Sequence, residues 1–229
     1  MTVDVLIPAF NEEQAIGKVI GEIPAELVQE IIVIDNGSTD GTVIAARKAG
    51  ATVIEEKQKG YGAACLKGLS YLSSKSQDEL PDVVVFLDGD YSDYPAQMNL
   101  LLAPIHKGDA VLVIGSRALG KKVKGSMTIP QRVGNWIATH MLYFLYGERF
   151  TDLGPFRAIK YDSLKRLNMQ DQNFGWTVEM QLKAAKMKMP CAEVAVDYRK
   201  RIGKSKISGT LKGAVSAGVI IIKTLLKYR

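Results

Sequence analysis

Five short apolar runs, separated by segments with a different pattern, constrain the fold of this 229-residue chain more than any other feature. The runs are VDVLIPA (3–9), EIIVID (30–35), ATVIEE (51–56), VVVFLD (83–88) and AVLVIGS (110–116). They are rich in Val and Ile and mostly continuous rather than alternating, which is typical of strands buried on both faces. Helical spacing follows the first four at 12–23, 40–49, 61–74 and 95–106. This alternation predicts an α/β fold with a mostly parallel central sheet flanked by helices.

The second half of the chain changes pattern but has no linker that would separate a second domain. It contains helical stretches at 131–146 and 174–189, a strand-like AEVAVDYR at 192–199 and a basic Gly/Ser loop at 200–210. A content of 47% hydrophobic residues supports a real core. We therefore predict a single domain over residues 1–210, followed by an apolar and basic helix at 211–229.

Charge and the N-terminus limit the partners and the location. Lys and Arg exceed Asp and Glu by 30 to 24, which suits a nucleic acid, a phosphorylated substrate or an anionic membrane. No RNA- or DNA-binding motif accompanies the charge, so we expect no nucleic acid partner. The N-terminus lacks a basic region followed by a long apolar run, and no window reaches the roughly 18 apolar residues of a spanning helix. We expect a cytoplasmic protein, soluble or peripheral on the cytoplasmic membrane face, with Cys65 and Cys191 reduced.

Two carboxylates follow the fourth apolar run, in the stretch VVVFLDGDYSDYP at 83–95. Asp88 and Asp90 are two residues apart, so in a strand they would point the same way and repel each other. Ligands of such sheets bind beyond the carboxyl ends of the strands, where Asp35 also lies. A few hard oxygen ligands are what Mg²⁺ or Mn²⁺ takes when substrate phosphates complete its shell. The pair therefore predicts a divalent cation that bridges phosphates.

Several ordered motifs resemble those of family 2 glycosyltransferases, which have the A-type, Rossmann-like nucleotide-sugar fold. They are LIPAFNEE (6–13), IIVIDNGSTDGT (31–42), KGYGAACLKG (59–68), FLDGDYSDYP (86–95) and VIGSR (113–117). Three later motifs are similar to the branch of dolichyl-phosphate mannose synthases and related polyprenyl-phosphate glycosyltransferases: TDLGPFRAIK (151–160), GWTVEMQLKA (175–184) and YRKRIGKSKISGT (198–210). The resemblance implies an inverting, metal-dependent hexosyltransferase with a GDP-mannose or UDP-glucose type of donor.

The resemblance also implies the residues that bind the donor. They are Pro8, Ala9, Asn11, Glu12, Asp35, Asn36, Gly62, Asp88, Gly89, Asp90 and Arg117. Asp88 and Asp90 would hold Mg²⁺ or Mn²⁺, and the glycines of GYG (60–62) would let the backbone approach the nucleotide. Many relatives carry two acids where this chain has Asp35-Asn36, so both guanine and uracil stay open as the base. Asp93 is either a further metal or sugar ligand or a charge at a helix start.

The catalytic residues depend on the acceptor. The implied catalytic set is Asp90, Arg117, Asp152 and Glu179. A hydroxyl acceptor would need a carboxylate base, for which Asp152 and Glu179 are the candidates. A polyprenyl (dolichyl or undecaprenyl) phosphate is already anionic and needs cations instead, for which the candidates are Arg132, Arg199, Arg201, Lys204 and Lys206. A third hypothesis is a non-catalytic module that binds nucleotide-sugar or anionic lipid. The intact pair of aspartates argues against that hypothesis.

Two apolar stretches are candidates for membrane contact. NWIATHMLYFLYG (135–147) places Trp136, Tyr143 and Phe144 at helical spacing, and the stretch at 211–229 carries several lysines. Both are too short to span a bilayer, yet both fit helices that lie in its interface. They equally fit core helices of a soluble enzyme. Interfacial helices would make the protein peripheral on a membrane surface or dependent on a membrane partner protein.

Overall fold

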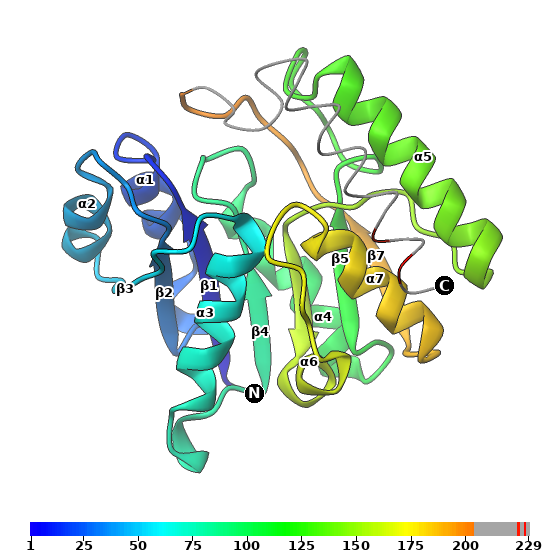
Figure 1. Cartoon of the computed structure of the whole chain (residues 1–229), viewed down its shortest axis with the longest axis horizontal. Coiled ribbons are helices and arrows are strands. Elements are labelled where there is room, and N and C mark those ends of the chain that lie inside the picture. Colours follow the sequence, from blue (N-terminus) through cyan, green and yellow to red (C-terminus); the bar gives the residue numbers. More distant parts are fainter. Residues whose placement is uncertain (204–223, 225–226, 228–229) are drawn as a thin grey trace.

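The computed structural model describes residues 1–203, 224 and 227, and it shows one seven-stranded sheet with helices on both faces (Figure 1). The strands are β1 (Val3–Ala9), β2 (Glu30–Asp35), β3 (Thr52–Glu55), β4 (Val83–Phe86), β5 (Leu112–Ser116), β6 (Arg157–Lys160) and β7 (Cys191–Ala195). The α-helices are α1 (Ile16–Gly21), α2 (Thr42–Lys48), α3 (Tyr61–Ser73), α4 (Met98–Lys107), α5 (Ile129–Tyr146), α6 (Tyr161–Leu167) and α7 (Trp176–Lys186). Short 3-10 helices are η1 (Ala25–Leu27), η2 (Gln77–Glu79) and η3 (Pro95–Gln97).

The sheet has the strand order β3-β2-β1-β4-β6-β5-β7 and is mostly parallel, which confirms the predicted fold class. The parallel pairs are β1 with β2, β1 with β4, β2 with β3 and β5 with β7. All five apolar runs of the first half form strands. The sequence analysis missed β6, which runs antiparallel between β4 and β5. Its first residue is Arg157, whose buried guanidinium donates to the carbonyl oxygens of Gly154 and Thr177.

The sheet is buried on both faces by two separate hydrophobic clusters. Leu6 of β1 packs in the cluster that includes residues of α3, α5, α6 and α7. Its neighbours Val5 and Ile7 point the other way, into the cluster that includes residues of α1, α2 and α4. Figure 1 shows α3 and α7 on the near face of the sheet. The helices on each side of the sheet therefore explain why its strands are apolar at consecutive positions. Cys65 and Cys191 are free thiols, as predicted.

The carboxyl ends of β1, β2 and β4 meet at one edge of the sheet. Ala9 pairs with Asp35 at the ends of β1 and β2, and Leu6 pairs with Phe86 near the end of β4. The loops that follow are tied together, because the backbone N–H of Thr39 donates to the Asn11 side chain at 2.8 Å. This edge is where the sequence placed its acidic residues.

The segment after β7 crosses to the same edge and is hydrogen-bonded to the loop that follows β4. The backbone N–H of Arg199 donates to the carbonyl oxygen of Ser92 at 2.9 Å, and that of Ile202 donates to the carbonyl oxygen of Asp90 at 2.9 Å. Residues 199–202 are therefore held beside the two aspartates by the main chain.

The helix predicted at 211–229 lies outside the described residues, apart from Thr224 and Lys227, which are helical. Thr224 is buried, and its hydroxyl oxygen lies next to Gly175. The boundary at residue 210 stays a prediction.

Within the part of the chain that the structure describes, no helix combines the length and the apolar character needed to cross a membrane.

Candidate active site

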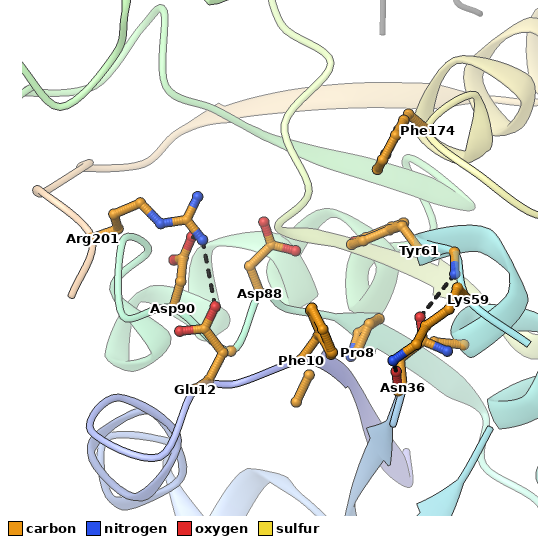
Figure 2. A pocket seen from close by; sticks show the side chains of 14 residues that line it. Pro8, Phe10, Glu12, Asn36, Lys59, Tyr61, Asp88, Asp90, Phe174 and Arg201 are labelled. Atoms are coloured by element: carbon orange, nitrogen blue, oxygen red, sulfur yellow. Dashed lines mark hydrogen bonds and ion pairs between the residues drawn. The ribbon is translucent and has the colours of Figure 1, made fainter. Parts of the chain in front are cut away.

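A cavity of about 290 Å³ opens at the edge where β1, β2 and β4 end (Figure 2). Its lining is Pro8, Ala9, Phe10, Glu12, Asn36, Lys59, Gly60, Tyr61, Ala64, Asp88, Gly89, Asp90, Phe174 and Arg201. Eight of these residues belong to the predicted site: Pro8, Ala9, Glu12, Asn36, Asp88, Gly89, Asp90 and Arg201. The structure therefore brings together residues that the sequence spreads over almost 200 positions.

Asp88 and Asp90 form the acidic floor of this cavity. One oxygen of Asp88, Oδ1, is buried and accepts no hydrogen bond. Burial, and then the charge of Asp90, raise the pKa of Asp88 to about 7, although Arg201 lowers it in part. Asp90 is also buried, and its Oδ1 accepts the backbone N–H of Ser92 at 2.9 Å. A buried carboxylate oxygen without a donor is energetically unfavourable unless a cation or a ligand approaches it.

Arg201 lies between two carboxylates on one side of the cavity. Its Nη2 is 2.7 Å from Oδ2 of Asp90 and 3.5 Å from Oε1 of Glu12. Figure 2 shows the guanidinium next to these side chains. The predicted acceptor cation is therefore adjacent to the predicted metal ligands.

The chemistry of this edge fits a divalent cation. Asp88 and Asp90 present hard oxygens to one cavity, and Oδ1 of Asp88 is buried without a hydrogen-bond partner, which suits a cation ligand. Among the described residues, no group of three or more His, Cys, Asp or Glu side chains converges tightly enough to hold a metal. Two carboxylates are what Mg²⁺ or Mn²⁺ uses when substrate phosphates supply further ligands.

Arg117 and Asp152 form a buried ion pair behind the cavity. Nε and Nη2 of Arg117 donate to the two carboxylate oxygens of Asp152, each at 2.7 Å, and the backbone N–H of Arg117 donates at 2.8 Å. Burial disfavours both charges, yet the pair raises the pKa of Arg117 and lowers the pKa of Asp152. Asp152 is therefore a charged partner of Arg117, and neither side chain lines the cavity.

Asp93 is buried close to this pair, and neither carboxylate oxygen accepts a hydrogen bond. Burial, followed by repulsion from Asp88, raises the pKa of Asp93 well above its ordinary value. The 3-10 helix η3 begins two residues later, with Tyr94 as an N-cap that makes no side-chain cap, and both roles predicted for Asp93 stay predictions.

Glu179 lies on α7, behind the wall of the cavity. Its carboxylate is fully buried, accepts the backbone N–H groups of Gln170 and Asp171, and pairs with Lys183 at 2.6 Å. These contacts fix the chain at 170–171. The following residues, 171–174, pack on α3 and provide Phe174 to the cavity.

The predicted close approach at Gly62 is made to the protein itself. A Cβ at Gly62 would collide with the carbonyl oxygen of Asp171, and one at Gly60 would collide with that of Gln172. The backbone N–H of Gly62 donates to Asn173 O at 3.0 Å. These glycines therefore admit residues 171–174, and Gly60 also lines the cavity, so the predicted approach of this backbone to a nucleotide stays a prediction.

The two residues after β2 have different roles. The Asn36 amide group donates to the carbonyl oxygens of Glu56 and Gln58 at 3.0 and 2.7 Å, and its oxygen accepts the N–H of Gly60 at 2.8 Å. This side chain therefore orders residues 56–60. Asp35 accepts backbone N–H groups through Oδ2, whereas its buried Oδ1 has no hydrogen-bond partner.

The other predicted acceptor cations lie away from the cavity or outside the described residues. Arg199 stacks on the rings of Tyr91 and Tyr94 and pairs with Glu22 at 2.7 Å. Arg132 is exposed on α5. Lys204 and Lys206 lie outside the described residues.

Sequence reasoning missed five side chains that line the cavity: Phe10, Lys59, Tyr61, Ala64 and Phe174. Lys59 lies over the Phe10 ring at 4.2 Å and donates to the carbonyl oxygens of Asn36 and Gly37, both at 2.9 Å. The Tyr61 hydroxyl is buried beside Asp88. Lys59 and Tyr61 occur in the motif KGYG, which was a usable signal, whereas nothing in the sequence marked Phe174.

The sheet order and the acidic cavity at its carboxyl edge define the A-type glycosyltransferase fold. A solved structure of glucosyl-3-phosphoglycerate synthase from Mycobacterium tuberculosis, in complex with Mn²⁺, UDP-glucose and phosphoglyceric acid, is similar, with a TM-score of 0.75. It is 25% identical in sequence, and the match covers 99% of this chain and 79% of that chain. The model of glycosyl transferase family 2 matches residues 4–167. The chain therefore belongs to glycosyl transferase family 2 and is a glycosyltransferase.

Two curated relatives extend the similarity over nearly the whole chain. A dolichyl-phosphate hexose transferase from Haloferax volcanii is 32% identical over 98% of this chain and 94% of its own length. An undecaprenyl-phosphate mannosyltransferase from Micrococcus luteus is 27% identical over 96% of this chain and 93% of its own length. Both names denote transfer to a polyprenyl phosphate.

Proposed function

We propose that this enzyme transfers a hexose from a nucleotide-sugar to a polyprenyl phosphate, with inversion at the anomeric carbon. The observation that carries the proposal is Arg201, a guanidinium that lines the same cavity as Asp88 and Asp90. A cation at this place can bind an anionic acceptor next to the donor diphosphate. The names of the two polyprenyl-phosphate relatives support the same acceptor class.

In this proposal the nucleoside lies toward the end of the cavity formed by Phe10, Asn36, Lys59 and Gly60. Asp35 does not itself line the cavity, but it precedes Asn36, which does, and its unpartnered Oδ1 would accept a hydrogen bond from a base or ribose that reached it. Asn36 supports this end through the loop at 56–60 rather than through a hydrogen bond of its own to the base. The base is either uracil or guanine.

The diphosphate lies over the acidic end of the cavity. Asp88 and Asp90 are the residues that would hold Mg²⁺ or Mn²⁺, and a bound ion would neutralise the charge of the leaving diphosphate. Arg117 is set behind this end, fixed by Asp152. We assign Asp152 a positioning role, because its two oxygens are committed to Arg117.

A phosphate acceptor fits the fact that neither candidate base, Asp152 or Glu179, lines the cavity. Asp152 pairs with Arg117, and Glu179 accepts backbone N–H groups behind the wall. A lipid phosphate carries its own negative charge and needs no deprotonation to attack. It does need a cation, and the planar fork of Arg201 can bind two phosphate oxygens.

A lipid acceptor also requires contact with a membrane surface, and α5 supplies the best candidate. The side chains of Ile129, Val133, Trp136, Ile137, Tyr143 and Phe144 on this helix are exposed. Exposed apolar and aromatic side chains along one helix, with Arg132 among them, fit a helix that lies in the interface of an anionic bilayer. We therefore place the enzyme as a peripheral protein on the cytoplasmic membrane face.

A second candidate function is transfer to a hydroxyl of a phosphorylated small molecule. It is favoured by the similar structure of glucosyl-3-phosphoglycerate synthase, whose complex contains phosphoglyceric acid. Arg201 would then bind the phosphate of such an acceptor.

An acceptor comparison tests the proposal. Release of nucleoside diphosphate is measured with UDP-glucose or GDP-mannose, Mn²⁺, and one of three additions: a short polyprenyl phosphate, the matching polyprenol, or 3-phosphoglycerate. We expect release only with the polyprenyl phosphate. Stimulation by 3-phosphoglycerate instead would support the second candidate, and donor binding without release under any condition would support a binding module.

The variants Arg201→Lys and Arg199→Lys provide a matched pair, because each keeps its charge and loses the fork. We expect Arg201→Lys to weaken the apparent affinity for polyprenyl phosphate about tenfold. Arg199 lies away from the cavity, so Arg199→Lys should leave that affinity unchanged. Equal affinities in both variants would remove Arg201 from the acceptor site.

A further inference from the structure

Arg201 contacts carboxylates at the end of the cavity where the predicted metal ligands lie. Three carboxylates line the cavity, those of Glu12, Asp88 and Asp90, and the Arg201 guanidinium contacts two of them. The other cation in the described lining is Lys59, which is engaged with the carbonyl oxygens of Asn36 and Gly37. Arg201 therefore supplies the positive charge at the acidic end of the cavity.

We propose that Arg201 is the resident counter-ion of Asp90 before the donor binds, and that the metal displaces it toward the acceptor phosphate. This inference rests on the proposed function and adds an order of events to it. Arg201 would serve two anions in turn, first the carboxylates of the donor site and then the phosphate of the acceptor.

The displacement follows from competition for the same oxygen. A divalent cation on Asp90 needs lone pairs that Nη2 of Arg201 now uses at 2.7 Å. Two cations cannot share that position, because like charges at such a separation repel strongly in a partly buried site. Repulsion from a metal ion on Asp90 would therefore move the guanidinium away from this carboxylate.

The surroundings of Arg201 allow its side chain to move while its backbone stays in place. The N–H of Ile202 is hydrogen-bonded to the carbonyl oxygen of Asp90 at 2.9 Å, so the main chain remains attached to the loop that carries the carboxylate. Nε of Arg201 is buried without a hydrogen-bond partner, so the guanidinium is held by its Nη2 contacts alone among those described. Its side chain is partly exposed, which leaves it a route toward an incoming phosphate.

A displaced Arg201 couples the two substrates. Without metal and nucleotide, the guanidinium is neutralised by Asp90 and Glu12 and has little to offer an anionic acceptor. With both bound, it becomes available, and the acceptor phosphate meets an unpaired arginine. Binding of the acceptor should therefore follow binding of the metal and the nucleotide diphosphate.

Direct measurement of Mn²⁺ binding tests this inference without any sugar transfer. The free Mn²⁺ concentration is followed by electron paramagnetic resonance for the wild type, Arg201→Gln and Lys200→Gln. Lys200 is the adjacent, exposed cation that does not line the cavity, so its variant removes the same charge without removing the contact. We expect Arg201→Gln to bind Mn²⁺ about tenfold more tightly in the absence of nucleotide, and Lys200→Gln to change the affinity less than about twofold.

Two outcomes would overturn the displacement while leaving the proposed function intact. One is an unchanged Mn²⁺ affinity in Arg201→Gln, and the other is an equal gain in both variants, which would indicate only a long-range charge effect. A third outcome would overturn the proposed metal site together with the displacement of Arg201. This outcome is a wild-type protein that binds no Mn²⁺, either with or without UDP.

A second measurement follows the acceptor side. Binding of a short polyprenyl phosphate to the wild type is titrated with and without Mn²⁺ and UDP. We expect at least about a tenfold gain in affinity when both are present, and loss of that gain in Arg201→Gln. An affinity that is independent of Mn²⁺ and UDP would overturn the coupling.

Discussion

Replacing Asp152 by Asn separates a positioning role from a catalytic one. Asp152 is buried and accepts Nε and Nη2 of Arg117, both at 2.7 Å, and the backbone N–H at 2.8 Å. Asn keeps the shape and one acceptor oxygen but leaves the buried guanidinium without a counter-ion. Removing one partner of a buried pair costs roughly 3 to 5 kcal/mol. For a domain of this size we expect the melting temperature to fall by roughly 6 to 20 °C.

The assay is thermal and urea unfolding, with sugar transfer measured on the same samples. Asp162→Asn is the matched control, because Asp162 pairs with Lys165 at the surface with 88% of its side chain exposed, against 1% for Asp152. An exposed pair contributes about 1 kcal/mol or less. If Asp152→Asn unfolds like the wild type, then Asp152 does not hold Arg117 in a buried ion pair and the positioning role is refuted.

Further experiments test the metal site, the cavity wall and the membrane surface. Because the pKa of Asp88 is raised to about 7, its proton competes with the metal, and Mn²⁺ binding with UDP should weaken as the pH falls from about 8 to about 6; a flat profile would contradict this. Because this pKa is raised in the folded state, the proton on Asp88 stabilises the metal-free fold at acid pH, and this stabilisation is lost as the pH rises through 7. The free energy of unfolding of the wild type should therefore fall over this pH range relative to that of Asp88→Asn. Gly62→Ala should lower the melting temperature and weaken UDP binding, because its Cβ would collide with the carbonyl oxygen of Asp171. The control Gly134→Ala has open space around its Cβ and should do neither. Equal effects in both variants would refute the role of residues 171–174 as a wall of the cavity. Phe144→Asp on α5, where the side chain is 87% exposed, should reduce cosedimentation with anionic vesicles, and Ile44→Asp on α2 should not; unchanged sedimentation of both would exclude α5 as the membrane surface.

The fold was predictable where hydrophobic pattern alone decides it. Each of the continuous runs of Val and Ile forms a strand. Helices cover both faces of the sheet, so residues on both sides of each strand are buried and apolar. The strand β6 escaped because it is four residues long and begins with Arg157, a charge that periodicity assigns to the surface. Its guanidinium donates to the nearby carbonyl oxygen of Gly154 and to that of Thr177 in α7, and no local pattern records the contact with α7.

The sequence predicted several of the residues that form the site, but not which charged residues pair with each other. The motifs selected Asp88, Asp90 and Arg201, and the structure places all three at one cavity. The sequence carries no sign that Asp152 is paired with Arg117 or that Arg199 stacks on Tyr91, because these partners are far apart along the chain. The role of each charged residue was therefore open until its counter-ion was known.

The central claim is that the paired carboxylates hold a cation on the donor diphosphate, and Asp90→Asn tests it most directly. Asn relieves the repulsion between the aspartates and still accepts the backbone N–H of Ser92, so the fold should persist. Sugar transfer to polyprenyl phosphate is measured for this variant and the wild type at saturating Mn²⁺. We expect the rate to fall by about a hundredfold or more, the scale of losing a few kcal/mol of electrostatic stabilisation. Transfer by Asp90→Asn at close to the wild-type rate would contradict the claim.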